Sequence, residues 1–206
     1  MRTMQYPADT PNAGEGISTQ AAIGANDMVC FDDIQHQCDE LAANILADCQ
    51  SRGLKIASAE SLTAGLLADA FVRIPGASNV FLGSAVTYDI NAKASVLHVD
   101  AQLLDREGAV HPEVARQMAI GTANLYAQPQ YGDSIIGLST TGVAGPGPDG
   151  DKPAGLVYIG LRLPGALTGG EASVMAKELH LHGSREDVRH QTVLNVLAAL
   201  WNALTT

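Results

Sequence analysis

Aromatic residues are scarce in this chain: Phe, Trp and Tyr make up 4% of its 206 residues, whereas hydrophobic residues of all kinds make up 46%. A core must therefore be built mainly from Ala, Val, Ile and Leu in closely packed layers. The chain is long enough to bury such a core without disulfide or metal staples. Length and composition predict one globular domain and exclude a disordered chain.

Cysteine is also rare, with only Cys30, Cys38 and Cys49 present. The three thiols form no C-x-x-C pair and have no histidine at metal spacing, so neither a disulfide scaffold nor a metal site is expected. Such a pattern is typical of reduced thiols, which favours a cytoplasmic protein. We expect Cys38 and Cys49 to serve as small apolar residues on one helix.

Positive charge is in short supply, because 12 Lys and Arg face 22 Asp and Glu and give a formal net charge of −10. No basic stripe offsets this balance locally, so binding to a nucleic-acid backbone is not expected. No run of about 18 apolar residues is present, and a membrane span is therefore not expected either. A few backbone N–H groups and one or two arginines can still bind a small anion.

The pattern along the chain predicts a flexible N-terminal extension over residues 1–30 and a single domain over residues 31–206. Helical spacing begins at Phe31 and ends before Gly53. Further helices are expected at 64–73, 91–97, 112–126 and 184–204, and strands at 54–59, 80–88, 134–140, 154–163 and 172–182. The last two strands are expected to pair antiparallel. This order predicts an α/β fold, a three-layer α/β/α sandwich with a mixed sheet.

The strongest local signal is the turn Glu60-Ser61-Leu62-Thr63, which joins a buried strand to a helix. A serine there lies beside the free N–H groups of the first helical turn, which can stabilise an oxyanion. Ser61 is thus a candidate nucleophile. The alternative is that Ser61 or Thr63 is only a helix N-cap.

A nucleophilic serine needs a base, and no histidine is expected beside this turn. Lys93 is the better candidate, because a lysine among small and apolar neighbours can lose its proton. Tyr88, at the end of the preceding strand, could assist the proton transfer through its hydroxyl. A solvated lysine stem and a core tyrosine are the plainer interpretations.

A Gly/Pro-rich loop follows the strand at 134–140 and offers hydroxyls and exposed backbone N–H groups. Such a loop suits a phosphate or carboxamide, although it matches no established nucleotide motif. Arg185 and Arg189 lie one turn apart on the last helix and could meet a phosphate, although such pairs are usually solvated.

Seven segments occur together in order: A-E-S-L-T-A-G, P-G-A-S-x-V-F-x-G, V-T-Y, N-A-K, G-A-V, T-T-G-V-A-G-P and K-P-A-G. Together they resemble the C-terminal domain of the competence/damage-inducible protein CinA, the family that includes nicotinamide-nucleotide amidase. The similarity runs from about residue 34 to the last helix. The chain resembles the stand-alone form of this domain.

The resemblance implies deamidation of nicotinamide mononucleotide to nicotinic acid mononucleotide and ammonia, without a cofactor, by a homo-oligomer. The catalytic residues that it implies are Ser61, Tyr88 and Lys93. The expected substrate contacts are Glu60, Thr63, Ala64, Gly65, Thr140, Thr141, Gly142, Gly145 and Arg185. Backbone N–H groups near residues 63–65 are expected to hold the oxyanion. The alternative function is a non-catalytic nucleotide-binding module that acts through protein partners.

Three positions depart from the family's pattern. Ala64 stands where the motif usually has glycine, Ile90 replaces a commonly polar residue, and His111 stands where serine is frequent. The Ala64 methyl group is expected to crowd a close backbone approach or to force φ negative. None of the three removes a catalytic group.

Overall fold

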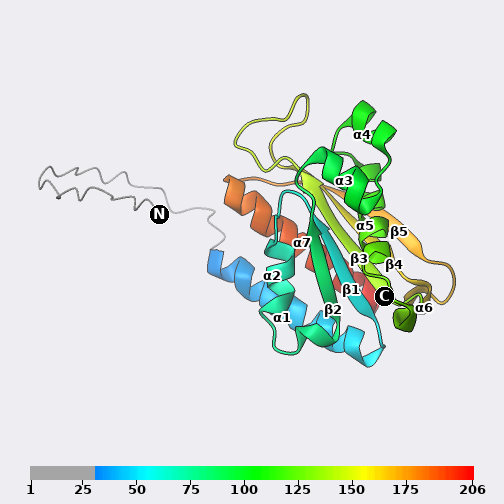
Figure 1. The fold of residues 1–206 in the computed structure, drawn as a ribbon. Coiled ribbons are helices and arrows are strands. Elements are labelled where there is room, and N and C mark those ends of the chain that lie inside the picture. The colour runs from blue at the N-terminus through cyan, green and yellow to red at the C-terminus, as the bar shows by residue number, and fades with distance from the viewer. Residues whose placement is uncertain (1–30) are drawn as a thin grey trace, which may run out of the picture.

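The fold is a five-stranded mixed sheet covered by helices on both faces, as Figure 1 shows for the computed structural model. The structure describes residues 31–206, so the expectation for residues 1–30 and for Cys30 lies outside the described residues. The strand order is β2-β1-β3-β4-β5. The strands are β1 (Lys55–Glu60), β2 (Phe81–Val86), β3 (Ile135–Gly142), β4 (Leu156–Leu163) and β5 (Ser173–His180).

Strand direction divides the sheet into two parts. β1 pairs parallel with both β2 and β3, whereas β3–β4 and β4–β5 are antiparallel. The predicted antiparallel pairing of the last two strands and the mixed three-layer sheet are therefore confirmed. The three parallel strands all end at one edge, with Glu60 aligned to Val86 on one side and to Thr140 on the other.

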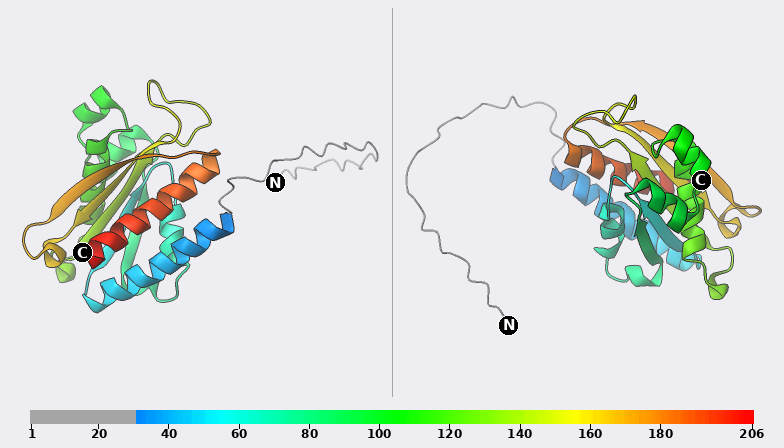
Figure 2. Two further views of the ribbon diagram at one scale, coloured as in Figure 1. Left: turned by 180° about the vertical axis from the view of Figure 1, so that it is seen from behind. Right: turned by 45° about the horizontal axis from the view of Figure 1, so that its top comes forward.

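One face of the sheet carries α1 (Phe31–Ser51), α2 (Leu66–Val72) and α7 (Arg185–Thr205). Figure 2 shows α1 and α7 side by side across this face. They enclose the larger part of the core, in which Ile56, Leu138 and Ile159 from the sheet are fully buried. Cys38 and Cys49 lie buried in the same core as free thiols, and burial raises their pKa values to about 11 and about 12.

The opposite face carries α5 (Pro112–Leu125), with α3 (Ile90–Leu97) packed against it and α4 (Ala101–Glu107) following α3. Pro112 occupies the first turn of α5 as predicted, and His111 caps this helix by accepting the Glu113 N–H at Nδ1, 3.1 Å away. The His111 ring thus does the capping work of a serine. Ser184 and Asp187 form the predicted capping box of α7.

The predicted helices need three corrections. Helix α2 begins at Leu66 instead of residue 64, because Ala64 and Gly65 have φ values of 45° and 102°. Helix α4 was not predicted, although Asp100 caps it and Gly108 ends it. The short α6 (Gly165–Thr168) likewise falls in the predicted turn between β4 and β5. Within residues 31–206, none of the helices is both long and apolar enough to cross a membrane.

Candidate active site

The candidate site lies where the three parallel strands end. Ser61 follows β1 directly, and Tyr88 lies two residues beyond β2. Thr140, Thr141 and Gly142 form the last part of β3. Since β1 is the central strand of the three, the Ser61 turn is flanked on both sides by the other predicted site residues. Polar groups at the carboxyl ends of parallel strands are the usual place for a ligand.

Lys93 and Ser61 are in direct contact. The Lys93 Nζ to Ser61 Oγ distance is 3.0 Å, and Nζ also donates to the Thr87 carbonyl at 2.6 Å. Lys93 comes from the first turn of α3, whose N-cap is Asp89, and its side chain has no solvent exposure. Within residues 31–206, no carboxylate accepts a hydrogen bond from Nζ.

Burial without such a partner disfavours the charged ammonium. It lowers the Lys93 pKa to about 8, against a smaller opposing effect of the Asp89 charge. Once Lys93 is neutral, its lone pair can accept the Ser61 hydroxyl proton along the same 3.0 Å contact. The pair therefore has the geometry of a nucleophile and its base.

Glu60 stabilises the Ser61 turn through hydrogen bonds. Its side chain is fully buried and accepts five hydrogen bonds. The donors are Thr63 Oγ1, Ser84 Oγ and the backbone N–H groups of Gly65, Leu67 and Ala68, all 2.8–3.0 Å away. Because both carboxylate oxygens are occupied, Glu60 fixes the turn and has no free oxygen for a substrate. The expected substrate contact of Glu60 is therefore corrected to a positioning role.

The expected oxyanion donors also need correction. The Ala64 N–H donates to the Ser61 carbonyl at 3.2 Å, and the Gly65 N–H donates to Glu60 at 2.9 Å. By contrast, the N–H groups of Leu62 and Thr63 have no acceptor within residues 31–206. These two amides directly follow Ser61. Thr63 is fully buried, whereas Leu62 lines the pocket beside the turn, so the Leu62 N–H is the candidate oxyanion donor.

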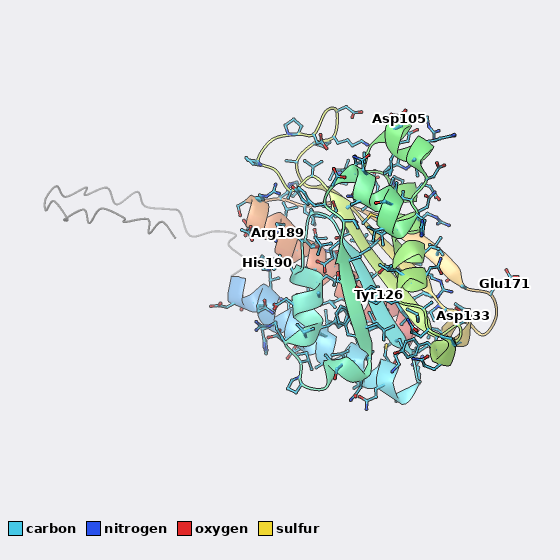
Figure 3. The ribbon with its side chains drawn as sticks, in the orientation of Figure 1. Asp105, Tyr126, Asp133, Glu171, Arg189 and His190 are labelled. Atoms are coloured by element: carbon cyan, nitrogen blue, oxygen red, sulfur yellow. The ribbon has the colours of Figure 1, made fainter. Side chains whose placement is uncertain are left out.

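Arg189 ties the Ser61 turn to α7. Its Nε donates to the Leu62 carbonyl at 2.9 Å, and its Nη2 donates to the Thr63 carbonyl at 3.0 Å. Figure 3 shows Arg189 on the part of α7 that lies towards α2. The guanidinium thus binds the carbonyls of the same two residues whose N–H groups are free. The phosphate contact that the sequence suggests for Arg189 is therefore corrected, because Arg189 binds the turn.

The hydroxyls of Thr140 and Thr141 are engaged within the protein. Thr140 Oγ1 and Thr63 Oγ1 are 2.8 Å apart, and Thr141 Oγ1 donates to the Ala109 carbonyl at 2.7 Å. Thr140 also accepts the Ser61 N–H at its carbonyl. Gly142 has no room for a side chain, since a Cβ there would lie 2.7 Å from Val157. These residues shape the site instead of presenting hydroxyls to it.

A polar pocket of about 280 Å³ opens beside the turn, lined by Leu62, Tyr88, Gly145 and Arg185 among others. Arg185 crosses it, because Nη1 donates to the Gly145 carbonyl at 2.7 Å and Nη2 to the Tyr88 hydroxyl at 3.1 Å. Tyr88 is 63% exposed. No hydrogen bond in the described chain joins its hydroxyl to Ser61 or Lys93.

No metal is indicated at this site. Over residues 31–206, no group of three or more His, Cys, Asp or Glu side chains is placed to hold a metal ion. The acidic Glu60 next to Ser61 is instead surrounded by hydrogen-bond donors from the chain itself.

The fold and the site together define a class: a three-layer α/β domain with a buried serine–lysine pair at the carboxyl edge of its parallel strands. The family model described as the CinA C-terminal domain matches residues 38–204. The chain therefore belongs to the CinA C-terminal domain family.

Relatives and solved structures carry competence and damage names. A competence-damage inducible protein of Clostridium botulinum (strain ATCC 19397 / Type A) is 43% identical over 160 residues, which is 77% of this chain and 35% of that protein. This chain thus spans about a third of the length of such relatives. The crystal structure of the competence/damage inducible protein CihA from Agrobacterium tumefaciens has 34% identity and a TM-score of 0.71, covering 82% of this chain and 96% of that one. The competence damage-inducible protein A (ComA) from Klebsiella pneumoniae has 28% identity and a TM-score of 0.72, covering 82% and 97%.

Ala64 provides a first test of the turn. The expectation that the methyl group forces φ negative is wrong, because Ala64 has a left-handed φ of 45°, a conformation that is costly for a residue with a Cβ. We expect Ala64→Gly to raise the free energy of unfolding by about 1 kcal/mol in urea denaturation. Ala47→Gly, at an exposed position inside α1, is the matched control and should lower it by about 0.5–1 kcal/mol. A loss of stability in Ala64→Gly would contradict the strained turn.

Arg189 provides a second test. Arg189→Lys keeps the charge but cannot span the Leu62 and Thr63 carbonyls with a planar fork. Because those carbonyls lose their donors, we expect the free energy of unfolding to fall by about 1–3 kcal/mol. Arg116→Lys is the control, since Arg116 is a half-exposed residue of α5 whose one ion pair within residues 31–206 is with Glu113, and it should change stability by less than about 0.5 kcal/mol. Equal effects of the two substitutions would show that Arg189 does not hold the turn.

Proposed function

We propose that this protein hydrolyses the carboxamide of nicotinamide mononucleotide to nicotinic acid mononucleotide and ammonia. The observation that carries the proposal is the 3.0 Å contact between Ser61 Oγ and a fully buried Lys93 whose pKa is lowered to about 8. The substrate is supported by the motif resemblance to nicotinamide-nucleotide amidases. The free Cys38 and Cys49 thiols favour a reducing compartment such as the cytoplasm.

The first half of the proposed reaction forms an acyl-enzyme. Ser61 Oγ attacks the carboxamide carbon while its proton passes to neutral Lys93, directly or through the Tyr88 hydroxyl. The N–H group of Leu62 stabilises the oxyanion that develops on the carbonyl oxygen. The tetrahedral intermediate collapses as the C–N bond breaks, and Lys93 returns its proton to the leaving nitrogen, which departs as ammonia.

The second half removes the acyl group. Lys93, neutral again, takes a proton from a water molecule that attacks the Ser61 ester. The ester C–O bond breaks, Ser61 recovers the proton from Lys93, and the product leaves as a carboxylic acid. Burial of Lys93 is what keeps its amine available as a base in both halves.

The proposal is tested by ammonia release from nicotinamide mononucleotide. We expect Ser61→Ala to lower the rate by at least about 1000-fold, because the acyl-enzyme can no longer form. Ser51→Ala, at the exposed end of α1, is the matched control and should keep full activity. Calorimetric binding of the nucleotide should be similar in all three proteins. Binding without ammonia release by the unmodified protein would contradict the proposal and favour a nucleotide-binding module.

The pH dependence follows from Lys93. The neutral amine is the active form, so kcat/KM should rise about tenfold per pH unit below the Lys93 pKa of about 8 and level off above it. Measurements between pH 6.5 and 9.5 avoid the second ionisation of the substrate phosphate, which lies near 6. A rate that is flat from pH 6.5 to 8.5, or that still rises beyond pH 9.5, would contradict Lys93 as the base.

A further inference from the structure

Arg185 joins three parts of the chain at the mouth of the pocket. It comes from the first turn of α7, binds the carbonyl of Gly145 in the loop after β3, and binds the hydroxyl of Tyr88 after β2. Both of its partners are neutral. The Arg185 side chain is nonetheless exposed, so a ligand in the pocket can reach it.

The pocket is lined by one residue of each charge. Arg185 is the one cation and Asp149 the one anion among the residues that line it. A guanidinium binds a phosphate through parallel charge-assisted hydrogen bonds, which are stronger than bonds to a carbonyl or a phenol. A dianionic phosphate in this pocket therefore competes with both neutral partners for the guanidinium of Arg185.

We propose that Arg185 exchanges Tyr88 for the phosphate of the substrate, so that the Tyr88 hydroxyl becomes available to Ser61 and Lys93 only when a phosphorylated amide is bound. The inference rests on the proposed function and adds to it the class of substrate that can start the reaction. It also explains why Tyr88, whose motif places it with the catalytic residues, contacts Arg185 and neither member of the serine–lysine pair in this structure.

The exchange gives the phosphate two effects. It anchors the nucleotide near α7, and it releases Tyr88 from Arg185. A nucleoside that lacks the phosphate can do neither, even if its ring and carboxamide fit beside Leu62. Phosphate recognition is then a condition for turnover and more than a source of affinity.

Kinetics with two substrates test this specificity. For the unmodified protein, we expect kcat/KM for nicotinamide mononucleotide to exceed that for nicotinamide riboside by at least about 100-fold. Inorganic phosphite, added with the riboside, should raise its turnover at least about tenfold because it occupies the place of the phosphate. In Arg185→Gln, the preference should fall to within about fivefold and phosphite should have no effect. Arg116→Gln is the matched control and should behave like the unmodified protein.

Two kinetic results would overturn the exchange. One is an Arg185→Gln variant that loses the same factor on both substrates, which indicates a structural role for Arg185. The other is phosphite that leaves riboside turnover unchanged in the unmodified protein. Absence of any Ser61-dependent ammonia release is a different outcome, because it contradicts the proposed function itself.

A spectroscopic measurement tests the exchange without turnover. In a Ser61→Ala protein labelled with fluorotyrosine, the fluorine signal of Tyr88 is identified by its loss in Tyr88→Phe. We expect nicotinamide mononucleotide and phosphite to shift this signal, nicotinamide riboside to leave it in place, and Arg185→Gln to place it near the shifted position before any ligand is added. An equal shift with the riboside, or no shift with phosphite, would show that phosphate does not release Tyr88.

Discussion

The site depends on a lysine that is buried without a carboxylate to neutralise it. Lys93 has no solvent exposure, and its nearest partners are the Thr87 carbonyl and the Ser61 hydroxyl. An ammonium group in such surroundings loses hydration that a carbonyl and a hydroxyl replace only in part. The consequence is a lowered pKa, and with it an amine that can be neutral while it touches a serine.

A buried base is useful only if the nucleophile is held in place, and two charged residues hold the Ser61 turn. Glu60 accepts hydrogen bonds from five donors, and Arg189, on α7, donates to two carbonyls of the turn. Both charges are thereby satisfied by neutral dipoles of the backbone and hydroxyls, apart from the pair that Arg189 forms with Glu186. These contacts stabilise a turn in which Ala64 and Gly65 have left-handed conformations. In the same turn, the N–H groups of Leu62 and Thr63 have no acceptor within residues 31–206. Strain of this kind persists only where the surrounding structure fixes it.

The sequence predicted the layers of the fold and the pairing of Ser61 with Lys93, because both follow from local patterns and from strands that end at one edge. It did not predict which N–H, carbonyl and carboxylate groups are already hydrogen-bonded within the turn. Arg189 acts through contacts with Leu62 and Thr63, which lie 127 and 126 positions away, and no local spacing encodes these contacts. Four of the five donors to Glu60 lie within eight residues of it, but the sequence alone does not show that its carboxylate is buried among them. The start of α2 differs from the prediction because alanine favours a helix, whereas Ala64 lies in a turn in which its N–H binds the Ser61 carbonyl and its φ is left-handed. The helix α4 was missed even though Asp100 and Gly108 are ordinary start and stop signals.

The most direct test of the account is the titration of Lys93 itself. The Lys93 amine can be followed by NMR in uniformly ¹⁵N- and ¹³C-labelled protein, with its signal assigned by its loss in Lys93→Arg. The account predicts a midpoint for the Lys93 pKa near 8, well below that of the other lysines. A Lys93 midpoint close to the ordinary value of about 10.4 would contradict it, because the amine would then remain protonated beside Ser61.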